Sequence, residues 1–210
     1  MYGQTYTLME SSAGYVERGI ASWYGTKFHG QYTSSREPYD MYSFTAAHKT
    51  LPIPCYAQVT NLRNGRTLIV RVNDRGPFVD NRLIDLSYAA ADRLGILGTG
   101  TGLVEVRVID PRATSAAPAQ IATDNGATPV TTAPNLYLQV GAFQSRINAE
   151  RLREQLLRKA SVVVDIVKAT LNDGALYRVR LGPMENVEQA DSLNTLIHQL
   201  GLGEPHVVIN

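Results

Sequence analysis

Cysteine is almost missing from this chain of 210 residues: the only one is Cys55. A single thiol excludes an intrachain disulfide and a cysteine-rich metal site. Because Cys55 stands between Pro54 and Tyr56 in an apolar run, we expect a buried thiol. The sequence also lacks an acid-rich loop, a Cys/His cluster and a glycine-rich strand–helix turn, so we expect neither a metal nor a nucleotide or other cofactor.

The sequence also has no marked excess of positive or negative charge. Lys and Arg total 20 against 19 Asp and Glu, for a formal net charge of +1. No overall field therefore attracts nucleic acid or an anionic membrane, and we expect no nucleic-acid partner. No apolar run approaches the roughly 20 residues that span a bilayer, and the first residues lack the layout of a signal peptide. We expect a soluble chain, with any export signal or lipid anchor absent from it.

The stretch from Val70 to Phe78, VRVNDRGPF, is the best candidate for a functional site. Its alternation predicts a half-buried strand, which the turn-forming residues after Asn73 then end. Asp74 is thereby placed at a strand end beside Arg75. The alternative is structural: Asp74 would cap the turn and pair with Arg75. A second acid, Asp85, lies in an apolar setting, and we interpret it as the N-cap of a helix that begins near Ser87.

The first 110 residues predict a small, mostly β domain after a polar surface arm over 1–17. The predicted strands are 19–24, 44–47, 56–61, 67–73 and 103–109. Asn64-Gly65 is a hairpin signal because both positions tolerate positive φ. One helix is predicted from Ser87 to Leu94, ending at Gly95. We therefore expect a compact barrel over 18–110.

Residues 111–134 consist mostly of Ala, Thr, Pro, Ser and Gly, which predicts a flexible linker. The segment 135–210 then follows the order βαββαβ. Strands are predicted at 136–140, 162–167, 176–181 and 206–209. Helices are predicted from Ser145 to Ala160, with Leu152, Leu156 and Leu157 on one face, and from an Asn186–Gln189 capping pair to Gly201, with Ala190, Leu193, Ile197 and Leu200 inward. This order gives a ferredoxin-like sheet with helices on one face and a free face for a ligand.

The first domain resembles the double-psi β-barrel of the rare lipoprotein A family, which are periplasmic peptidoglycan lytic transglycosylases. The matching segments are Ala21-Ser22-Trp23-Tyr24-Gly25, Thr45 to Pro52, Val59-Thr60-Asn61, Asn64-Gly65-Arg66, Val70 to Phe78 and Leu83 to Ser87. The second domain resembles the SPOR repeat, a peptidoglycan-binding module. Its matching segments are Gln139 to Phe143 and Tyr177 to Pro183. The expected fold class is thus mainly β plus α+β, a double-psi β-barrel followed by a ferredoxin-like domain.

The resemblance implies that Glu37, His48 and Asp74 carry the activity. A lytic transglycosylase cuts the MurNAc–GlcNAc bond without water, and one carboxyl can donate and then remove a proton. We assign that role to Asp74, with Glu37 stabilising oxocarbenium charge and His48 orienting one of the two acids. Two alternatives stay open: Glu37 could be the proton donor, and His48 could fill the barrel edge. Tyr24 and Arg75 are candidates for binding the substrate, and Tyr24 would do so by stacking on a sugar. Trp23 is expected in the core.

Three positions depart from the families. Arg36 stands in Thr33-Ser34-Ser35-Arg36-Glu37 where the family usually has glycine, and it could move Glu37 or block the cleft. Cys55 replaces a small polar residue, and Met184 stands where SPOR domains commonly have phenylalanine. Neither of the latter two touches the expected chemistry.

On the SPOR sheet, strand alternation turns Gln139, Arg178 and Arg180 toward the free face. These side chains suit a glycan strand without stem peptides, because arginine can grip the free lactyl carboxylate of MurNAc. We expect an endolytic transglycosylase of such denuded strands, monomeric and periplasmic. In full-length form it would be an outer-membrane lipoprotein enriched at the division septum. The competing hypothesis is a non-catalytic septal peptidoglycan-binding protein, for which Arg36 is the best support.

Overall fold

The computed structural model describes residues 6–109, 134–160, 162–171 and 174–210. They form a barrel and a separate sheet with two helices. The predicted linker, 111–134, lies outside the described residues except for its last position. In the predicted arm, residues 6–15 contain neither helix nor strand, and the amide of Met9 donates to the carbonyl of Thr50 at 2.9 Å.

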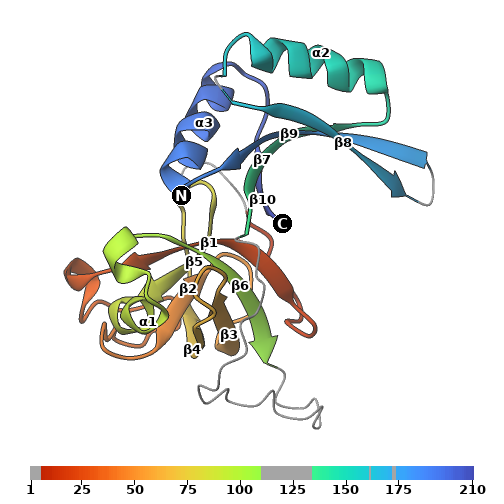
Figure 1. Cartoon of the computed structure of the whole chain (residues 1–210). Coiled ribbons are helices and arrows are strands. Elements are labelled where there is room, and N and C mark those ends of the chain that lie inside the picture. Colours follow the sequence, from red (N-terminus) through yellow and green to blue (C-terminus); the bar gives the residue numbers. More distant parts are fainter. Residues whose placement is uncertain (1–5, 110–133, 161, 172–173) are drawn as a thin grey trace, which may run out of the picture. The chain divides into compact units, whose positions relative to one another are not determined.

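The first unit is a closed barrel in which strands neighbour one another in the order β1-β5-β2-β4-β3-β6 (Figure 1). The strands are β1 Val16–Tyr24, β2 Thr45–His48, β3 Cys55–Asn61, β4 Thr67–Asp74, β5 Arg82–Ser87 and β6 Gly102–Ile109. The predicted double-psi barrel is confirmed. The sequence pattern misses only β5 among these strands, because its residues lead directly into a helix with no turn between them.

The helix that follows β5 is α1, Tyr88–Leu94, and its N-cap is Ser87. The Ser87 hydroxyl accepts a hydrogen bond from the amide of Ala90 at 3.2 Å. The prediction that Asp85 caps this helix was wrong, because Asp85 lies inside β5 and accepts from the hydroxyl of Ser22. Gly95 ends α1 with φ of 72°, as its place after the helix predicts.

The barrel core is built by strand alternation. Val70 and Val72 of β4 are fully buried, and Asn64-Gly65 joins β3 to β4 as an antiparallel hairpin in which Gly65 has φ of 72°. Trp23 packs against this core, as predicted. Cys55 is half-buried rather than buried, because it is the first residue of β3 and lies at the end of the strand. Two short 3-10 helices, Thr26–Phe28 and Leu97–Thr99, complete the unit.

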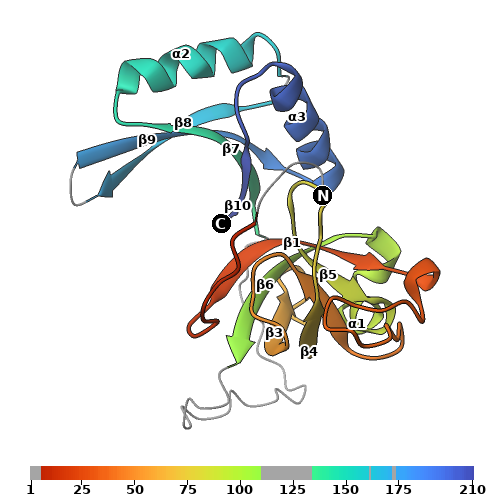
Figure 2. The ribbon, with the colours of Figure 1, turned by 180° about the vertical axis from the view of Figure 1, so that it is seen from behind.

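The second unit has the predicted order βαββαβ: β7 Leu136–Phe143, α2 Arg146–Leu157, β8 Val164–Leu171, β9 Gly174–Met184, α3 Val187–Gln199 and β10 His206–Ile209. The sheet order is β10-β7-β9-β8, and all three strand pairs are antiparallel. Both helices cover the same face of this sheet (Figures 1 and 2). The ferredoxin-like prediction is therefore confirmed.

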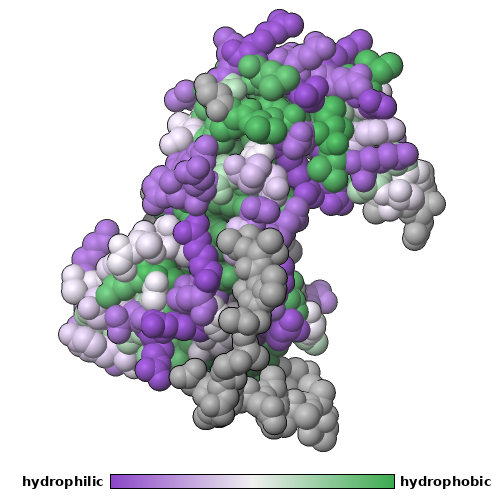
Figure 3. All heavy atoms as spheres, viewed as in Figure 1, coloured by the Kyte–Doolittle hydropathy of each residue, from purple (hydrophilic) through white to green (hydrophobic). Residues whose placement is uncertain are grey.

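The two helices bury the faces that their periodicity predicts, with two exceptions. In α2, Leu152 and Leu156 are buried with Ala149, but Leu157 is 48% exposed because it is the last helical residue. The outer side of α2 is accordingly hydrophilic (Figure 3). In α3, the side chain of Asn186 accepts from the amide of Gln189, as the capping pair predicts, whereas Leu200 is only half-buried.

A row of polar residues crosses the sheet of the second unit. Cross-strand pairing places His206, Gln139, Arg180 and Asp165 side by side on β10, β7, β9 and β8. Gln139 and Arg178 are half-buried. Arg180 shares the face of Gln139, since Val179 and Leu181 on either side of it are fully buried, but it is only 9% exposed. Its strand is interior to the sheet, so Gln139 and Asp165 flank it on both sides.

Candidate active site

A pocket of about 290 Å³ lies on the barrel where β4, β2 and β5 run side by side. It is lined by two acids, one arginine, several aromatic residues and a tight turn: Tyr24, Phe28, Gln31, Tyr32, Tyr39, Ala47, Asp74, Arg75, Gly76, Pro77, Phe78 and Asp85. The predicted residues Asp74, Arg75 and Tyr24 thus come together in one cavity. The predicted residues Glu37 and His48 do not line it.

Asp74 is the last residue of β4, and one of its oxygens is fully occupied. Its Oδ1 accepts from the Ser34 amide at 2.8 Å, the Ser34 hydroxyl at 2.7 Å and the Arg75 amide at 2.8 Å. A proton on this carboxyl would therefore have to be carried by Oδ2. The Asp74 side chain is thus held by Ser34 and by one amide of the turn, and the pairing with the Arg75 guanidinium that the structural alternative required is not formed.

Asp85 is the functional candidate that the sequence interpretation missed. Its Oδ1 accepts a short hydrogen bond from the hydroxyl of Ser22 on β1. Ile84 and Leu86, its neighbours on β5, are fully buried. Strand alternation therefore turns Asp85 away from the core, and this signal is present in the sequence. The sequence does not predict which strands pair with β5, and so it does not predict that Asp85 lies near Asp74.

Arg75 is held by backbone carbonyls. Its Nη1 donates to the carbonyl oxygens of His48 at 3.1 Å and Leu51 at 2.5 Å. No ion pair within 4.0 Å joins its guanidinium to any carboxylate of the described residues. The arginine thus brings a positive charge, outside any ion pair of the described residues, to the pocket wall beside Asp74.

His48 supports this arrangement from behind. It is 3% exposed, and its Nδ1 accepts from the amides of Thr50 and Leu51 at 3.2 and 3.1 Å. Because Nδ1 accepts, Nε2 carries the proton and donates to the hydroxyl of Tyr15 at 2.9 Å. Burial, and then the charges of Arg75 and Lys49, lower the pKa of His48 to about 4. Its imidazole orders the 48–51 segment that holds Arg75, and its ring nitrogens form no hydrogen bond with Asp74 or Glu37.

Glu37 is engaged in a different cluster. Both of its oxygens accept from the guanidinium of Arg71, and Asn73 donates to Oε2 at 3.2 Å. The hydrogen bonds from Arg71, and then from Asn73, lower the pKa of Glu37 to about 2. A carboxylate that remains ionised at neutral pH does not suit the role of proton donor. Its negative charge is also compensated by Arg71.

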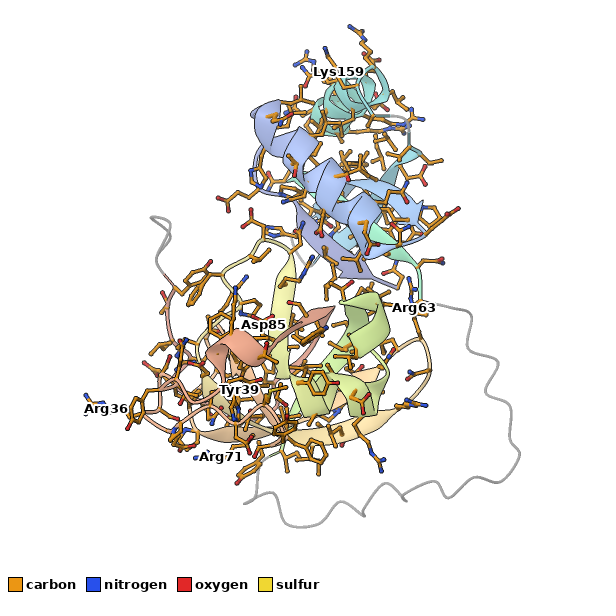
Figure 4. All side chains as sticks on the ribbon, turned by 90° about the vertical axis from the view of Figure 1, so that its left-hand side faces the viewer. Arg36, Tyr39, Arg63, Arg71, Asp85 and Lys159 are labelled. Atoms are coloured by element: carbon orange, nitrogen blue, oxygen red, sulfur yellow. The ribbon has the colours of Figure 1, made fainter. Side chains whose placement is uncertain are left out.

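Arg36 adopts the backbone conformation that glycine would favour. Its φ is 65°, and its amide donates to the Thr33 carbonyl at 2.9 Å within a tight turn. Its side chain extends away from the barrel at the outer edge of the loop (Figure 4). Arg36 is not among the residues that line the pocket, and Glu37 remains bound to Arg71. Arg36 therefore does not block this pocket.

Aromatic rings form the walls of the pocket. Tyr24 packs against the tilted ring of Tyr39 with ring centroids 4.3 Å apart, and it makes an edge contact with Phe28 at 6.3 Å. Burial raises the pKa of Tyr24. At the rim, Tyr32 is 79% exposed and Phe78 is 36% exposed. Exposed rings around a polar floor are typical of carbohydrate sites, because sugar faces are apolar and sugar edges are polar.

The described residues offer neither a cluster of metal ligands nor a helix that could cross a membrane. Among residues 6–109 and the described part of 134–210, no group of three or more His, Cys, Asp or Glu side chains is arranged to hold a metal ion. In the same residues, no helix has both the length and the apolar character that crossing a bilayer requires.

Comparison with known proteins identifies relatives along almost the whole chain. A family model described as lytic transglycolase matches residues 16–108, and the SPOR domain model matches residues 132–209. A protein from Pseudomonas aeruginosa named endolytic peptidoglycan transglycosylase RlpA is 40% identical over 253 residues, which covers 98% of this chain and 74% of that protein. A protein of the same name from Neisseria meningitidis serogroup B is 40% identical over 189 residues, 90% of this chain and 74% of that protein.

Two further matches each cover part of the chain. A Vibrio cholerae protein, also named endolytic peptidoglycan transglycosylase RlpA, is 59% identical over 107 residues, which is 51% of this chain and 41% of that protein. The crystal structure of the RlpA SPOR domain from Pseudomonas aeruginosa is 37% identical, covers 35% of this chain and 96% of that structure, and has a TM-score of 0.34.

Proposed function

The chain belongs to the family of RlpA endolytic peptidoglycan transglycosylases, and we propose that it cleaves MurNAc–GlcNAc bonds in glycan strands that lack stem peptides. The products would carry 1,6-anhydroMurNAc ends. The observation that carries this proposal is the pocket in which the carboxyl of Asp74 stands among aromatic rings. Such a pocket can hold a sugar ring against a carboxyl group that exchanges protons with it.

Asp74 is the proposed acid and base. Its Oδ2–H gives a proton to the glycosidic oxygen as the C1–O bond breaks, and the GlcNAc hydroxyl leaves. The C6 hydroxyl of the same MurNAc then attacks C1 and loses its proton to Asp74. One C–O bond breaks and one forms, the carboxyl is restored, and no water is consumed.

The other predicted pocket residues would bind substrate. Tyr24 and the rim aromatics would stack on sugar faces, and Arg75 would attract the lactyl carboxylate that a missing stem peptide leaves free. His48 would act through the segment that holds Arg75. Glu37 would stabilise the loop through Arg71 rather than take part in proton transfer.

The second unit would bind the same polymer. Gln139 and Arg178 are partly exposed on the sheet beside Arg180, and they would contact sugar amides and lactyl carboxylates. Two binding units on one chain raise the local concentration of the barrel on the glycan. This fits a cell-wall protein of the periplasm. We further propose a monomer that is enriched at the division septum and attached to the outer membrane by a lipid in its full-length form.

Incubation with amidase-treated sacculi tests this function. The proposal expects soluble fragments with 1,6-anhydro ends from the wild type and none from Asp74→Asn, in which the turn keeps an acceptor but the carboxyl proton is lost. The competing function is that of a non-catalytic binder, which would sediment with denuded sacculi and release nothing. Arg36, its best support in the sequence, is directed away from the barrel.

A further inference from the structure

Two acids flank a single small residue on three adjacent strands of the barrel. Ala47 on β2 is paired with Asp74 on β4 in one direction and with Asp85 on β5 in the other. The three residues therefore form one row over three adjacent strands. Since neighbouring strands lie about 4.8 Å apart, the Cα atoms of the two acids are separated by about 10 Å. The methyl group of Ala47 leaves the space between them open, and all three residues line the pocket.

The turn after β4 also brings the two acids together. Gly76 has φ of 135°, a backbone conformation that residues with a side chain rarely adopt. A Cβ atom built on Gly76 would lie 3.9 Å from Oδ2 of Asp85. The chain that leaves Asp74 thus passes directly beside the carboxylate of Asp85. In addition, the charges of both acids act on the hydroxyl of Tyr24, which lines the same pocket.

The proposed reaction has a role for such a second carboxylate. As the leaving oxygen departs, C1 and the ring oxygen of MurNAc acquire positive charge, which a fixed negative group can stabilise. Glu37 was expected to provide this group. It lies outside the pocket lining, and its charge is compensated by the two hydrogen bonds from Arg71.

We propose that Asp85 is the carboxylate that stabilises the oxocarbenium ion, opposite Asp74 as the acid and base. This inference rests on the proposed function for the identity of the substrate. The hydroxyl of Ser22 holds Oδ1 of Asp85 in place. Asp85 forms no bond to the sugar and exchanges no proton with it. Its charge lowers the barrier, while the proton moves only between Asp74 and the two substrate oxygens.

Binding of a charged sugar analogue tests this role without turnover. The probe is an N-acetylhexosamine iminosugar, whose ring ammonium mimics the oxocarbenium charge, and the reference is a neutral chitin trisaccharide. Loss of a charged partner should weaken iminosugar binding to Asp85→Asn by about 10-fold or more, while binding of the trisaccharide changes by less than about 2-fold. Asp80→Asn removes the same charge from an exposed residue outside the pocket lining and should change neither affinity. Equal iminosugar affinity in wild type and Asp85→Asn would overturn the proposal.

Turnover separates a catalytic from a structural role. On denuded glycan, Asp85→Asn should lower kcat by about 100-fold or more with little change in KM, as for other charge-stabilising groups. Ser22→Ala removes the hydrogen bond to Asp85 but keeps the charge of Asp85. If Asp85 is purely structural, kcat should fall equally in both variants. If the charge of Asp85 is catalytic, kcat should fall much less in Ser22→Ala than in Asp85→Asn. If the wild type releases no anhydro ends, the proposed function fails, and the iminosugar comparison still decides the role of Asp85.

Discussion

Acidification should destabilise the barrel through His48. The native imidazole is 3% exposed and accepts two amide hydrogen bonds at Nδ1, so a proton at that atom would remove both bonds. Burial is the main reason that the pKa of His48 falls from 6.5 to about 4. The unfolded chain, in contrast, takes up this proton near pH 6.5. The stability that neutral His48 contributes is thus complete above pH 6.5 and is lost as the pH falls toward 4.

The size of the loss follows from the two pKa values. One pKa unit corresponds to about 1.4 kcal/mol, so the full contribution of this group is about 3 kcal/mol. Between pH 7.5 and 4.5 we expect a loss of about 2.5 kcal/mol in the free energy of unfolding. Such a loss is a large part of the stability of an ordinary domain.

Urea unfolding followed by tryptophan fluorescence measures this effect. The chain has one tryptophan, Trp23, which packs against the barrel core and therefore reports on the barrel. The matched variant is His48→Asn, whose Oδ1 can accept the same amides but does not titrate. Other groups also titrate in this range, so the quantity of interest is the difference between the pH dependences of wild type and variant. Identical pH dependences would refute the reasoning.

Three further variants test other parts of the structure. Arg36→Gly should raise the free energy of unfolding by about 1 kcal/mol in urea, since glycine adopts φ of 65° without strain; an unchanged or lower value would contradict this. Ser87→Ala should lower it by about 1 kcal/mol or more, because the buried hydroxyl both caps α1 and donates to the Ser43 carbonyl at 2.6 Å; a change below about 0.3 kcal/mol would argue against both roles. The double variant Arg178→Ala/Gln139→Ala should sediment less with denuded sacculi, and its sedimentation should depend less on salt concentration. Its cleavage of soluble glycan fragments should be unaffected. Unaffected sedimentation would place the ligand elsewhere on the second unit.

Features set by neighbouring residues can be predicted from the sequence. Asn64-Gly65 specifies a hairpin because the turn needs positive φ, and Gly65 has φ of 72°. Asn186 caps α3 through an amide three residues away. The positive φ of Arg36 was likewise foreseeable, from the glycine that the family usually has there. In each case the controlling interaction lies within a few residues.

The composition of the pocket depends on partners that are distant in sequence. The Glu37–Arg71 ion pair joins residues 34 positions apart, and nothing near Glu37 indicates it. Asp85 looked like a helix cap because Ser87 and α1 follow it directly. Its position near Asp74 arises because β2 lies between β4 and β5, parallel to β4 and antiparallel to β5. No local sequence pattern specifies these pairings.

The fate of water during cleavage tests the central claim most directly. Amidase-treated sacculi are digested in water enriched in oxygen-18, and the ends of the released fragments are analysed by mass spectrometry. Attack by the C6 hydroxyl predicts anhydro ends without oxygen-18 and one water lighter than reducing ends, and it predicts no fragments from Asp74→Asn. Reducing ends that each carry one oxygen-18 atom would mean hydrolysis and would contradict the account.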